Sequence, residues 1–267
     1  MLKFSQIKIL KLGGSAITNK TEIFSVRKDV LNRIAEEVAE TNLNSLIIIH
    51  GGGSFGHPLA KQYKLYLGFK NQEQLAGFIK TRQAMTSLNK LVVDAFISKS
   101  VNVASIQPSS FIITKNGKIT SINVEILKKL LKLGLIPILY GDVVVDKTKG
   151  FTILSGDQLS ASLAVKFRAE RVVLATDVDG IFTMDPKTNP EAELIPRINL
   201  NQLKKILKTK IKNESTIDVT GVMFGKLKEM IPVLKTGIKV FVVNAFKRGN
   251  IFKALTEREV EGTILEP

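Results

Sequence analysis

Short apolar runs alternate with longer amphipathic segments along most of the chain. Each run is bounded by glycine, proline or polar turn residues, which is typical of strands buried on both faces of a sheet. The longer segments carry apolar residues at spacings of three and four, which predicts helices packed against that sheet. The alternation therefore predicts an α/β fold with one mainly parallel sheet, whose crossover helices cover both faces.

The predicted elements follow directly from this pattern. Strands are expected at residues 7–12, 46–50, 101–106, 136–140, 171–176 and 239–244. Helices are expected at residues 26–41, 72–100, 124–133, 158–167 and 222–234. Two further segments, 111–122 and 143–154, interrupt the alternation and are predicted to be β-hairpins.

The composition limits the chemistry available to the chain. Its 267 residues include no Cys and two His, which excludes disulfide scaffolds, thiolate metal sites and cysteine nucleophiles and argues against a histidine-rich zinc site. We therefore assign no residue to a metal. No linker, repeat or change of composition divides the chain, so residues 1–267 are expected to form a single domain.

The net charge of +15 suggests an anionic partner, which could be nucleic acid, an acidic membrane surface or a phosphorylated small molecule. The densest cationic stretch lacks interleaved aromatic residues and is predicted to be a solvated face; it contains Lys204, Lys205, Lys208, Lys210 and Lys212. No apolar run is long enough to cross a bilayer, and residues 1–6 lack the apolar core of a signal peptide. We expect a cytoplasmic protein.

Glycine-rich turns recur at the ends of predicted strands, where ligands bind in open α/β sheets. They lie at residues 11–15, 50–57, 155–157 and 176–180. In the first turn, Gly13 and Gly14 allow backbone N–H groups to approach an anion, and Lys11 and Lys20 can place two ammonium groups around it. A glycine pair can serve the turn alone, but two flanking lysines favour a phosphate clamp.

The second turn formally matches a dinucleotide-binding pattern through Gly51, Gly53 and Gly56. Three features argue against that interpretation: the match follows the second predicted strand, the acidic Glu73 falls at the polar start of a helix, and His57 comes directly after the turn. No Gly-Lys-Ser or Gly-Lys-Thr follows, so a Walker A loop is also absent. Any nucleotide is expected to be held in another way.

Three side chains near these turns have both a structural and a functional interpretation. His57 could cap a helix, but its position on an anion-binding loop favours contact with a bound phosphate. His50, inside the end of a strand, is better explained as a structural residue. Asp157 could be a helix N-cap, or its carboxylate could orient nearby ammonium groups such as that of Lys11.

Six motifs, taken in order, resemble the amino acid kinase superfamily over nearly the whole chain. They are residues 11–15, 50–57, 140–142, 155–157, 176–185 and 218–226. The combination of Lys11, Lys20, the 50–57 loop and the Ser-Gly-Asp turn most resembles the archaeal-type isopentenyl phosphate kinases. The resemblance implies an α/β/α sandwich in which residues 1–168 bind the phosphate acceptor and residues 169–267 bind ATP.

The resemblance also implies roles for individual residues. Catalytic roles fall to Lys11, Lys20, His57, Asp157 and Lys226. Acceptor binding falls to Gly52, Gly53, Ser54, His57 and Gly156. ATP binding falls to Lys11, Gly13, Gly14, Ser15, Asp177, Asp179, Gly180, Gly221 and Lys226. The chain departs from the family at Val222, where a second glycine is common, which puts the nucleotide contacts of this segment in question.

The implied reaction is ATP-dependent phosphorylation of isopentenyl phosphate to isopentenyl diphosphate, with Mg²⁺ and a homodimeric enzyme. A phosphate monoester already carries a nucleophilic oxygen, so alignment and charge neutralisation suffice. The walls of an apolar pocket for the acceptor's hydrocarbon are expected from Leu75, Phe78, Ile79, Val143 and Ile153, although such residues are more often core.

Two alternatives stay open. One is another kinase of the same superfamily, acting on a phosphonate such as fosfomycin, on a carboxylate or on uridylate. The other is a kinase-like binding or regulatory protein that uses the positive surface to bind nucleic acid, which a steep salt dependence of binding would reveal. The presence of Lys11, Lys20 and Asp157 favours an enzyme without nucleic-acid or membrane partners.

Overall fold

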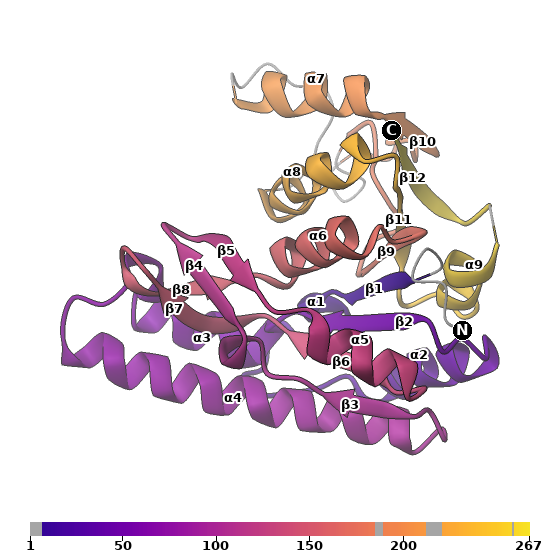
Figure 1. Ribbon diagram of the computed structural model, residues 1–267. Coiled ribbons are helices and arrows are strands. Elements are labelled where there is room, and N and C mark those ends of the chain that lie inside the picture. Colours follow the sequence, from indigo (N-terminus) through magenta and orange to yellow (C-terminus); the bar gives the residue numbers. More distant parts are fainter. Residues whose placement is uncertain (1–6, 185–188, 212–220, 258) are drawn as a thin grey trace.

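The computed structural model describes residues 7–184, 189–211, 221–257 and 259–267. Within these residues the main feature is an eight-stranded sheet with strand order β10-β12-β11-β9-β1-β2-β6-β3 (Figure 1). In chain order its strands are β1 (Lys8–Leu12), β2 (Leu46–His50), β3 (Val103–Ser105), β6 (Ile136–Tyr140), β9 (Arg171–Thr176), β10 (Arg197–Asn199), β11 (Lys239–Asn244) and β12 (Gly262–Glu266). Every neighbouring pair is parallel except β11 with β12. The predicted mainly parallel sheet is confirmed.

All of the apolar runs predicted as strands lie in this sheet. β2, β6, β9 and β11 have the predicted bounds, whereas β1 and β3 are shorter than predicted. β2 and β6 are buried at every residue, which explains why their sequences are apolar without alternation. The sequence analysis did not predict β10 and β12, which extend the sheet beyond β11.

Helices cover both faces of the sheet, which confirms the α/β/α sandwich. One layer contains α2 (Lys28–Glu40), α4 (Gln72–Ile97) and α9 (Asn250–Thr256). The short α1 (Gly14–Ile17) and α3 (Gly53–Gln62) belong to the same layer. The other contains α5 (Glu125–Lys132), α6 (Gly156–Phe167), α8 (Gly221–Lys235) and α7 (Leu200–Ile211), which packs on α8. The five predicted helices correspond to α2, α4, α5, α6 and α8.

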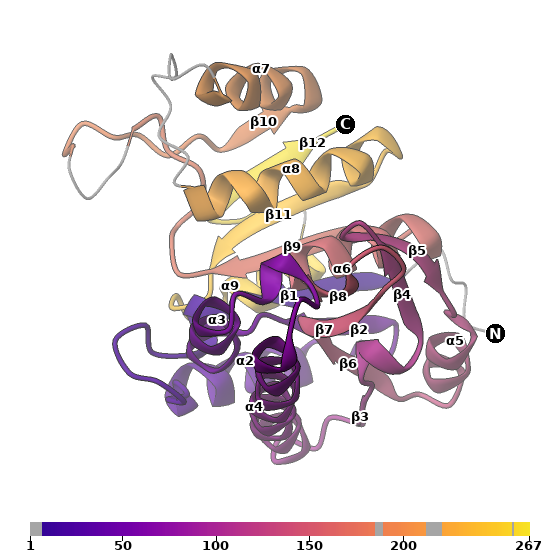
Figure 2. The same cartoon turned by 90° about the vertical axis from the view of Figure 1, so that its left-hand side faces the viewer.

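Both predicted hairpins are present, and they join into a second sheet. β4 (Ile112–Lys115) pairs with β5 (Lys118–Ile122), β7 (Asp142–Asp146) pairs with β8 (Gly150–Leu154), and the strand order is β5-β4-β7-β8. Figure 1 shows this small sheet to one side of the main one, and in Figure 2, seen from that side, strands β7 and β8 overlap β1 and β2. Asn116 and Gly117 have positive φ angles, as the two-residue turn between β4 and β5 requires.

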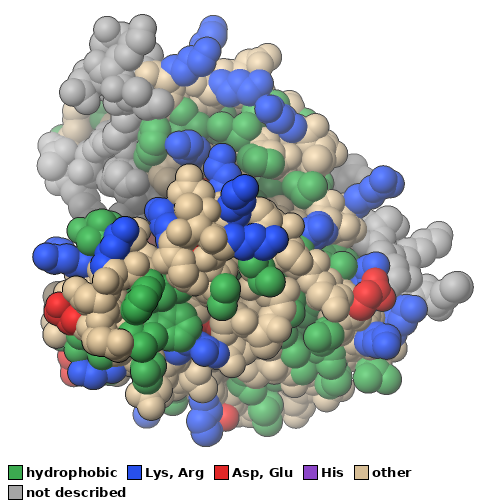
Figure 3. Space-filling view, turned by 60° about the vertical axis from the view of Figure 1, so that its left-hand side comes forward, with side chains coloured by type: hydrophobic (Ala, Val, Ile, Leu, Met, Phe, Trp, Pro, Cys, Tyr) green, Lys and Arg blue, Asp and Glu red, His purple; other side chains and the backbone are tan. Residues whose placement is uncertain are grey.

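Lys and Arg side chains are spread over the face seen in Figure 3, with hydrophobic side chains between them. On α7, Lys205 and Lys208 are exposed, as predicted for a solvated face. Lys212 of the same stretch lies outside the described residues, as do residues 1–6 and 218–220. Among the described helices, none is both long enough and apolar enough to span a bilayer.

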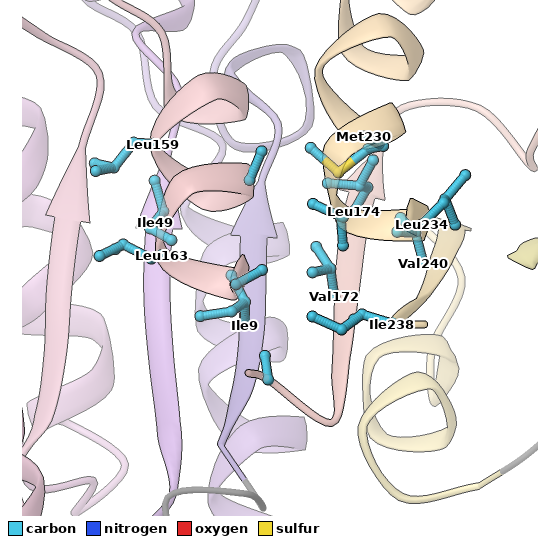
Figure 4. Packing of buried hydrophobic residues seen from close by; sticks show 14 of the residues in the cluster. Ile9, Ile49, Leu159, Leu163, Val172, Leu174, Met230, Leu234, Ile238 and Val240 are labelled. Carbon is cyan, nitrogen blue, oxygen red and sulfur yellow. The ribbon is translucent and has the colours of Figure 1, made fainter. Parts of the chain in front are cut away.

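The main sheet separates two large clusters of buried side chains, and a third, small cluster contains Ala60, Leu65, Val143 and Phe151. Figure 4 shows part of one cluster, in which Leu159 and Leu163 of α6 face the sheet beside Ile9 and Ile49. Burying one such side chain contributes about 1.5–3 kcal/mol. Packing of this kind fixes α6 against β1 and β2, and so places the first turn of α6 next to the ends of those strands.

Candidate active site

Two glycine turns meet at the carboxyl ends of β1 and β2. The strands pair in parallel with Leu12 opposite His50, so the turns that follow them lie side by side. A Cβ atom added to Gly14 would lie 2.3 Å from the backbone nitrogen of Gly53, and one added to Gly51 would lie 2.8 Å from the nitrogen of Gly14. Glycine is required at these positions because the two backbones touch.

A carboxylate flanked by two ammonium groups lies close to these turns. Asp157, in the first turn of α6, has its Oδ1 atom 2.7 Å from Nζ of Lys11 on β1 and its Oδ2 atom 3.4 Å from Nζ of Lys226 on α8. The Lys11 side chain is only 3% exposed, so its charge depends on this carboxylate. The predicted contact between Asp157 and Lys11 is therefore present, and it brings together three distant segments of the chain.

Burial and mutual charge set the protonation of this cluster. Burial lowers the pKa of Lys11 and Lys226 also lowers it, while Asp157 raises it; together these effects place the pKa at about 8. Burial would raise the pKa of Asp157, but the charges of Lys11 and Lys226 outweigh it and hold the pKa below its ordinary value. The cluster is therefore cationic at neutral pH, with two ammonium groups around one carboxylate.

A cavity of about 320 Å³ opens against this cluster. Seven of the predicted site residues line it: Lys11, Gly14, Gly52, His57, Gly156, Asp157 and Lys226. Burial lowers the pKa of His57, and the positive charges of Lys11 and Lys226 lower it further. The His57 ring is therefore neutral at pH 7 and can offer an N–H to a ligand in the cavity.

Apolar side chains line the same cavity. Val143 and Ile153 do so, as predicted, and they are cross-strand partners in the β7–β8 hairpin. The prediction was wrong for Leu75, Phe78 and Ile79, which do not line it. The remaining apolar lining comes from Ala60, Tyr66, Met85 and Leu154. A ligand with an anionic group and a short hydrocarbon would meet complementary surfaces here.

The other predicted lysine, Lys20, lies apart from this cavity. Its Nζ atom forms an ion pair with Asp177, and the hydroxyl of Ser15 donates to the same carboxylate at 2.7 Å. The Lys20 side chain is 60% exposed, so it can move without breaking the core. Ser15, Lys20 and Asp177 thus form a second polar group, next to the first glycine turn, and their roles toward a nucleotide stay predictions.

The remaining predicted nucleotide residues lie at the end of β9 and the start of α8. Asp179 accepts a hydrogen bond from the Asn244 side chain at 2.8 Å and lies 3.1 Å from Nζ of Lys247. A Cβ atom added to Gly180 would lie 2.6 Å from Oγ1 of Thr263, so close packing against β12 explains this glycine. Gly221 is the first residue of α8.

Two residues predicted to bind a ligand donate their hydrogen bonds to other parts of the protein. The N–H of Gly13 donates to the carbonyl of Ala175 at 2.7 Å, so this group is not available to a phosphate as predicted. Ser54 donates through its backbone N–H to Thr18 and through its hydroxyl to the carbonyl of Ser25. Both residues support the turns on which neighbouring residues face the cavity.

Sequence reasoning missed several lining residues, including Lys61, Thr81 and Gly141. Lys61 could have been found, because it follows His57 by one helical turn and the two share a face of α3. Gly141 stood inside a recognised motif but received no role. Thr81 carried no signal, because only the rotation of α4 about its axis decides which of its side chains face the cavity.

An α/β/α sandwich whose mainly parallel sheet ends in glycine turns beside a lysine–aspartate–lysine cluster is typical of a small-molecule phosphotransferase. The model of the amino acid kinase family matches residues 6–244. The chain is 39% identical to the isopentenyl phosphate kinase of Methanothermobacter thermautotrophicus, over 96% of this chain and 97% of that one. It is also 39% identical to the isopentenyl phosphate kinase of Methanocaldococcus jannaschii, over 97% and 98% of the two chains. A crystal structure described as isopentenyl phosphate kinase superposes with a TM-score of 0.84 at 36% identity, over 97% of this chain and all of that one.

The chain therefore belongs to the amino acid kinase family, and within it to the isopentenyl phosphate kinases. The resemblance stated from six motifs is confirmed.

Proposed function

We propose that the chain transfers the γ-phosphoryl group of ATP to isopentenyl phosphate and releases isopentenyl diphosphate and ADP. One observation carries the proposal: the cationic Lys11–Asp157–Lys226 cluster, neutral His57 and the apolar pair Val143 and Ile153 line a single cavity. An acceptor with a phosphate and a five-carbon hydrocarbon matches all three. The relatives that cover nearly the whole chain carry the same activity in their names.

The reaction is an in-line displacement that needs no strong base. An oxygen of the acceptor phosphate attacks the γ-phosphorus of ATP, a new P–O bond forms, and the bond to the β–γ bridging oxygen breaks to release ADP. At neutral pH the acceptor phosphate is already ionised, so no side chain has to remove a proton. The protein supplies alignment and positive charge.

Lys11 and Lys226 supply that charge. Both ammonium groups are held by one carboxylate, Asp157, so they are fixed before the substrates arrive. Because Lys11 is buried, its attraction for phosphoryl oxygens is little weakened by water. His57 positions the acceptor phosphate through an N–H donor, together with the backbone N–H groups of Gly52 and Gly53.

We infer that residues 169–267 hold most of the nucleotide and that residues 1–168 hold the acceptor. Asp179, Gly180 and Gly221 border the nucleotide, and Ser15, Lys20 and Asp177 lie between the two substrates. Lys20 can turn from Asp177 toward the transferring phosphoryl group because most of its side chain is exposed.

ATP enters as its magnesium complex, in which Mg²⁺ neutralises charge on the β- and γ-phosphates. In the described part of the chain, no three acidic or histidine side chains converge as metal ligands would. Asp157 is held by two lysines, so Mg²⁺ would be bound through the oxygens of the ATP phosphates. We also infer a cytoplasmic homodimer from the resemblance; light scattering at working concentration would contradict the dimer by giving the mass of one chain.

The proposal is tested by ADP release with MgATP and equal concentrations of isopentenyl phosphate, dimethylallyl phosphate, fosfomycin, glutamate and uridylate. Preference for isopentenyl phosphate is expected. Preference for fosfomycin, glutamate or uridylate would assign the chain to another kinase activity of the family. No turnover with any acceptor, together with salt-dependent binding of nucleic acid, would support the binding-protein alternative.

A further inference from the structure

His50, the last residue of β2, is fully buried and hydrogen-bonded through both ring nitrogens. Its Nδ1 atom lies 3.0 Å from the carbonyl oxygen of Gly51, and its Nε2 atom lies 3.2 Å from Oδ1 of Asn89, whose Nδ2 faces the hydroxyl of Ser105. The ring stacks on Tyr140 with centroids 5.4 Å apart. These contacts fix both the position and the tilt of the ring, although His50 itself does not line the cavity.

The partners of the ring determine its tautomer. Burial lowers the pKa of His50 to about 4, so the ring is neutral near pH 7 and carries one N–H. The carbonyl of Gly51 can only accept, so the N–H must be on Nδ1. Nε2 must then accept a hydrogen bond, so the Asn89 amide takes the orientation with its nitrogen toward Nε2 and its oxygen toward the hydroxyl of Ser105. This orientation exchanges the positions that the structure gives to Oδ1 and Nδ2.

This bond also determines the direction of the next N–H group. The peptide between Gly51 and Gly52 is planar, and its C=O and N–H bonds point in opposite directions. Because His50 holds the carbonyl of Gly51, the N–H of Gly52 points away from the ring. Gly52 is buried and lines the cavity, and within the described residues no partner accepts its N–H. A buried N–H group without a protein acceptor is completed by a ligand or by water.

We propose that His50 is a positioning residue that holds the Gly51–Gly52 peptide so that the N–H of Gly52 donates to the acceptor phosphate. His50 touches neither substrate and acts only through this peptide. The identity of the phosphate rests on the proposed function, whereas the orientation of the peptide rests on the contacts of His50 alone. The structural role expected from the sequence thus serves the binding of the anion.

Two substitutions separate this role from simple packing. In His50→Asn the amide nitrogen can take the place of Nδ1 and keep the donor to Gly51, whereas in His50→Gln the amide reaches toward Nε2 and the donor is lost. We expect His50→Gln to raise the KM for isopentenyl phosphate about tenfold, with the KM for ATP unchanged, and His50→Asn to stay within about threefold of the unmodified enzyme. Both variants lose the stacking on Tyr140 and should melt at similarly lowered temperatures. Equal losses of acceptor affinity in the two variants, or no loss in either, would overturn the proposal.

A second measurement reads the tautomer directly. The chain has two His, so long-range ¹H–¹⁵N spectra contain two ring systems, and the His57→Ala variant assigns them. His50 is expected in the Nδ1–H form and without titration as the pH falls to about 5.5. The Nε2–H form, or protonation in this range, would contradict the proposal whatever the enzyme's activity.

The amide signal of Gly52 separates this proposal from the proposed function. Isopentenyl phosphate, or inorganic phosphate as a simpler probe, should shift that signal in the unmodified protein and in His50→Asn but not in His50→Gln. A phosphate that binds without shifting the Gly52 signal would overturn the role of His50. A shifted Gly52 signal without turnover of isopentenyl phosphate would support the role of His50 and count against the proposed reaction.

Discussion

Nζ of Lys11 and Oδ1 of Asp157 lie 2.7 Å apart, although Lys11 lies on β1 and Asp157 lies in the first turn of α6, which covers one face of the sheet. The contact exists because α6 packs across β1 and β2 and because its first turn reaches the carboxyl ends of those strands. It keeps a buried ammonium group charged, and the same carboxylate also holds Lys226. This pairing places two ammonium groups beside the cavity in which phosphoryl transfer is proposed.

Replacing Asp157 with asparagine should remove most activity without unfolding the protein. The amide keeps the shape of the carboxylate but leaves the ammonium groups of Lys11 and Lys226 without a counter-charge, so both lose their fixed positions. We expect kcat to fall by about 10²–10³. Steady-state kinetics measure the loss, and unchanged circular dichroism controls for folding. Activity close to that of the unmodified enzyme would show that the lysines are positioned by something else.

The activity should fall on the alkaline side as Lys11 loses its proton. Its pKa of about 8 means that the ammonium form predominates below pH 8 and shrinks to about one tenth at pH 9. Because the charged form is the active one, kcat/KM for the free enzyme should decline above about pH 8, and bound phosphates should move the decline in kcat to higher pH. In Lys11→Arg any remaining activity should lack this decline, because guanidinium stays charged. A flat profile of the unmodified enzyme up to about pH 9.5 would contradict the role of Lys11.

Ile153 should affect the acceptor and not the nucleotide. Its side chain lines the cavity, so Ile153→Ala removes apolar contact with the hydrocarbon and should raise the KM for isopentenyl phosphate about three- to tenfold, with the KM for ATP unchanged. Ile79→Ala is the matched control, because Ile79 is exposed and does not line the cavity. Equal effects of the two substitutions would place the hydrocarbon elsewhere.

The carboxylate of Asp146 joins the two hairpins and should matter for stability. It accepts hydrogen bonds from the hydroxyl of Thr114 and from the backbone N–H groups of Asn116, Gly117, Thr148 and Lys149. Asp146→Asn leaves some of these donors facing an NH₂ group, so the free energy of unfolding should fall by about 2–3 kcal/mol. Asp94→Asn, at an exposed ion pair, should cost less than about 0.5 kcal/mol.

The pH dependence of stability provides a further check on the role of Asp146. Burial would raise the pKa of this group, but the N–H donors outweigh it and hold the pKa below its ordinary value in the folded protein. Its contribution to stability is therefore present above the unfolded pKa of about 3.9 and is lost as the pH falls below it. The difference in the free energy of unfolding between the unmodified protein and Asp146→Asn, measured with a denaturant, should become smaller as the pH falls toward 3. A constant difference would contradict the assigned role.

The sequence predicted those parts of the fold whose signal is local. Strands buried on both faces, such as β2 and β6, are continuous apolar runs and were placed to the residue. β12 was missed because its short run becomes a strand only by pairing with β11 and β10. α3 was missed because its first turn is glycine-rich; glycine disfavours helices, and here the contact between the two turns overrides that preference.

In the candidate site too, the residues with a local signal in the sequence were predicted. Lys11 and His57 were predictable because the turns at the carboxyl ends of the parallel strands β1 and β2 meet at one edge of the sheet. Asp157 follows β8 of the small sheet, so its contact with Lys11 depends on how α6 packs against β1 and β2.

Val143 and Ile153 in the cavity wall were also predicted. The side chains that α4 contributes were not, because this helix carries apolar residues on most of its circumference. Thr81 and Met85, four residues apart, share the side that lines the cavity, whereas Leu75 and Ile79 do not. Only the packed structure decides this rotation.

One cavity brings a phosphate acceptor with a short hydrocarbon to the phosphoryl group of ATP, and ³¹P NMR of a reaction with MgATP and isopentenyl phosphate follows this transfer itself. We expect the single acceptor resonance to be replaced by two coupled diphosphate resonances as ADP appears, and Asp157→Asn to slow this conversion about 10²–10³-fold. ADP with inorganic phosphate and an unchanged acceptor resonance, or a product formed equally fast by Asp157→Asn, would contradict this expectation.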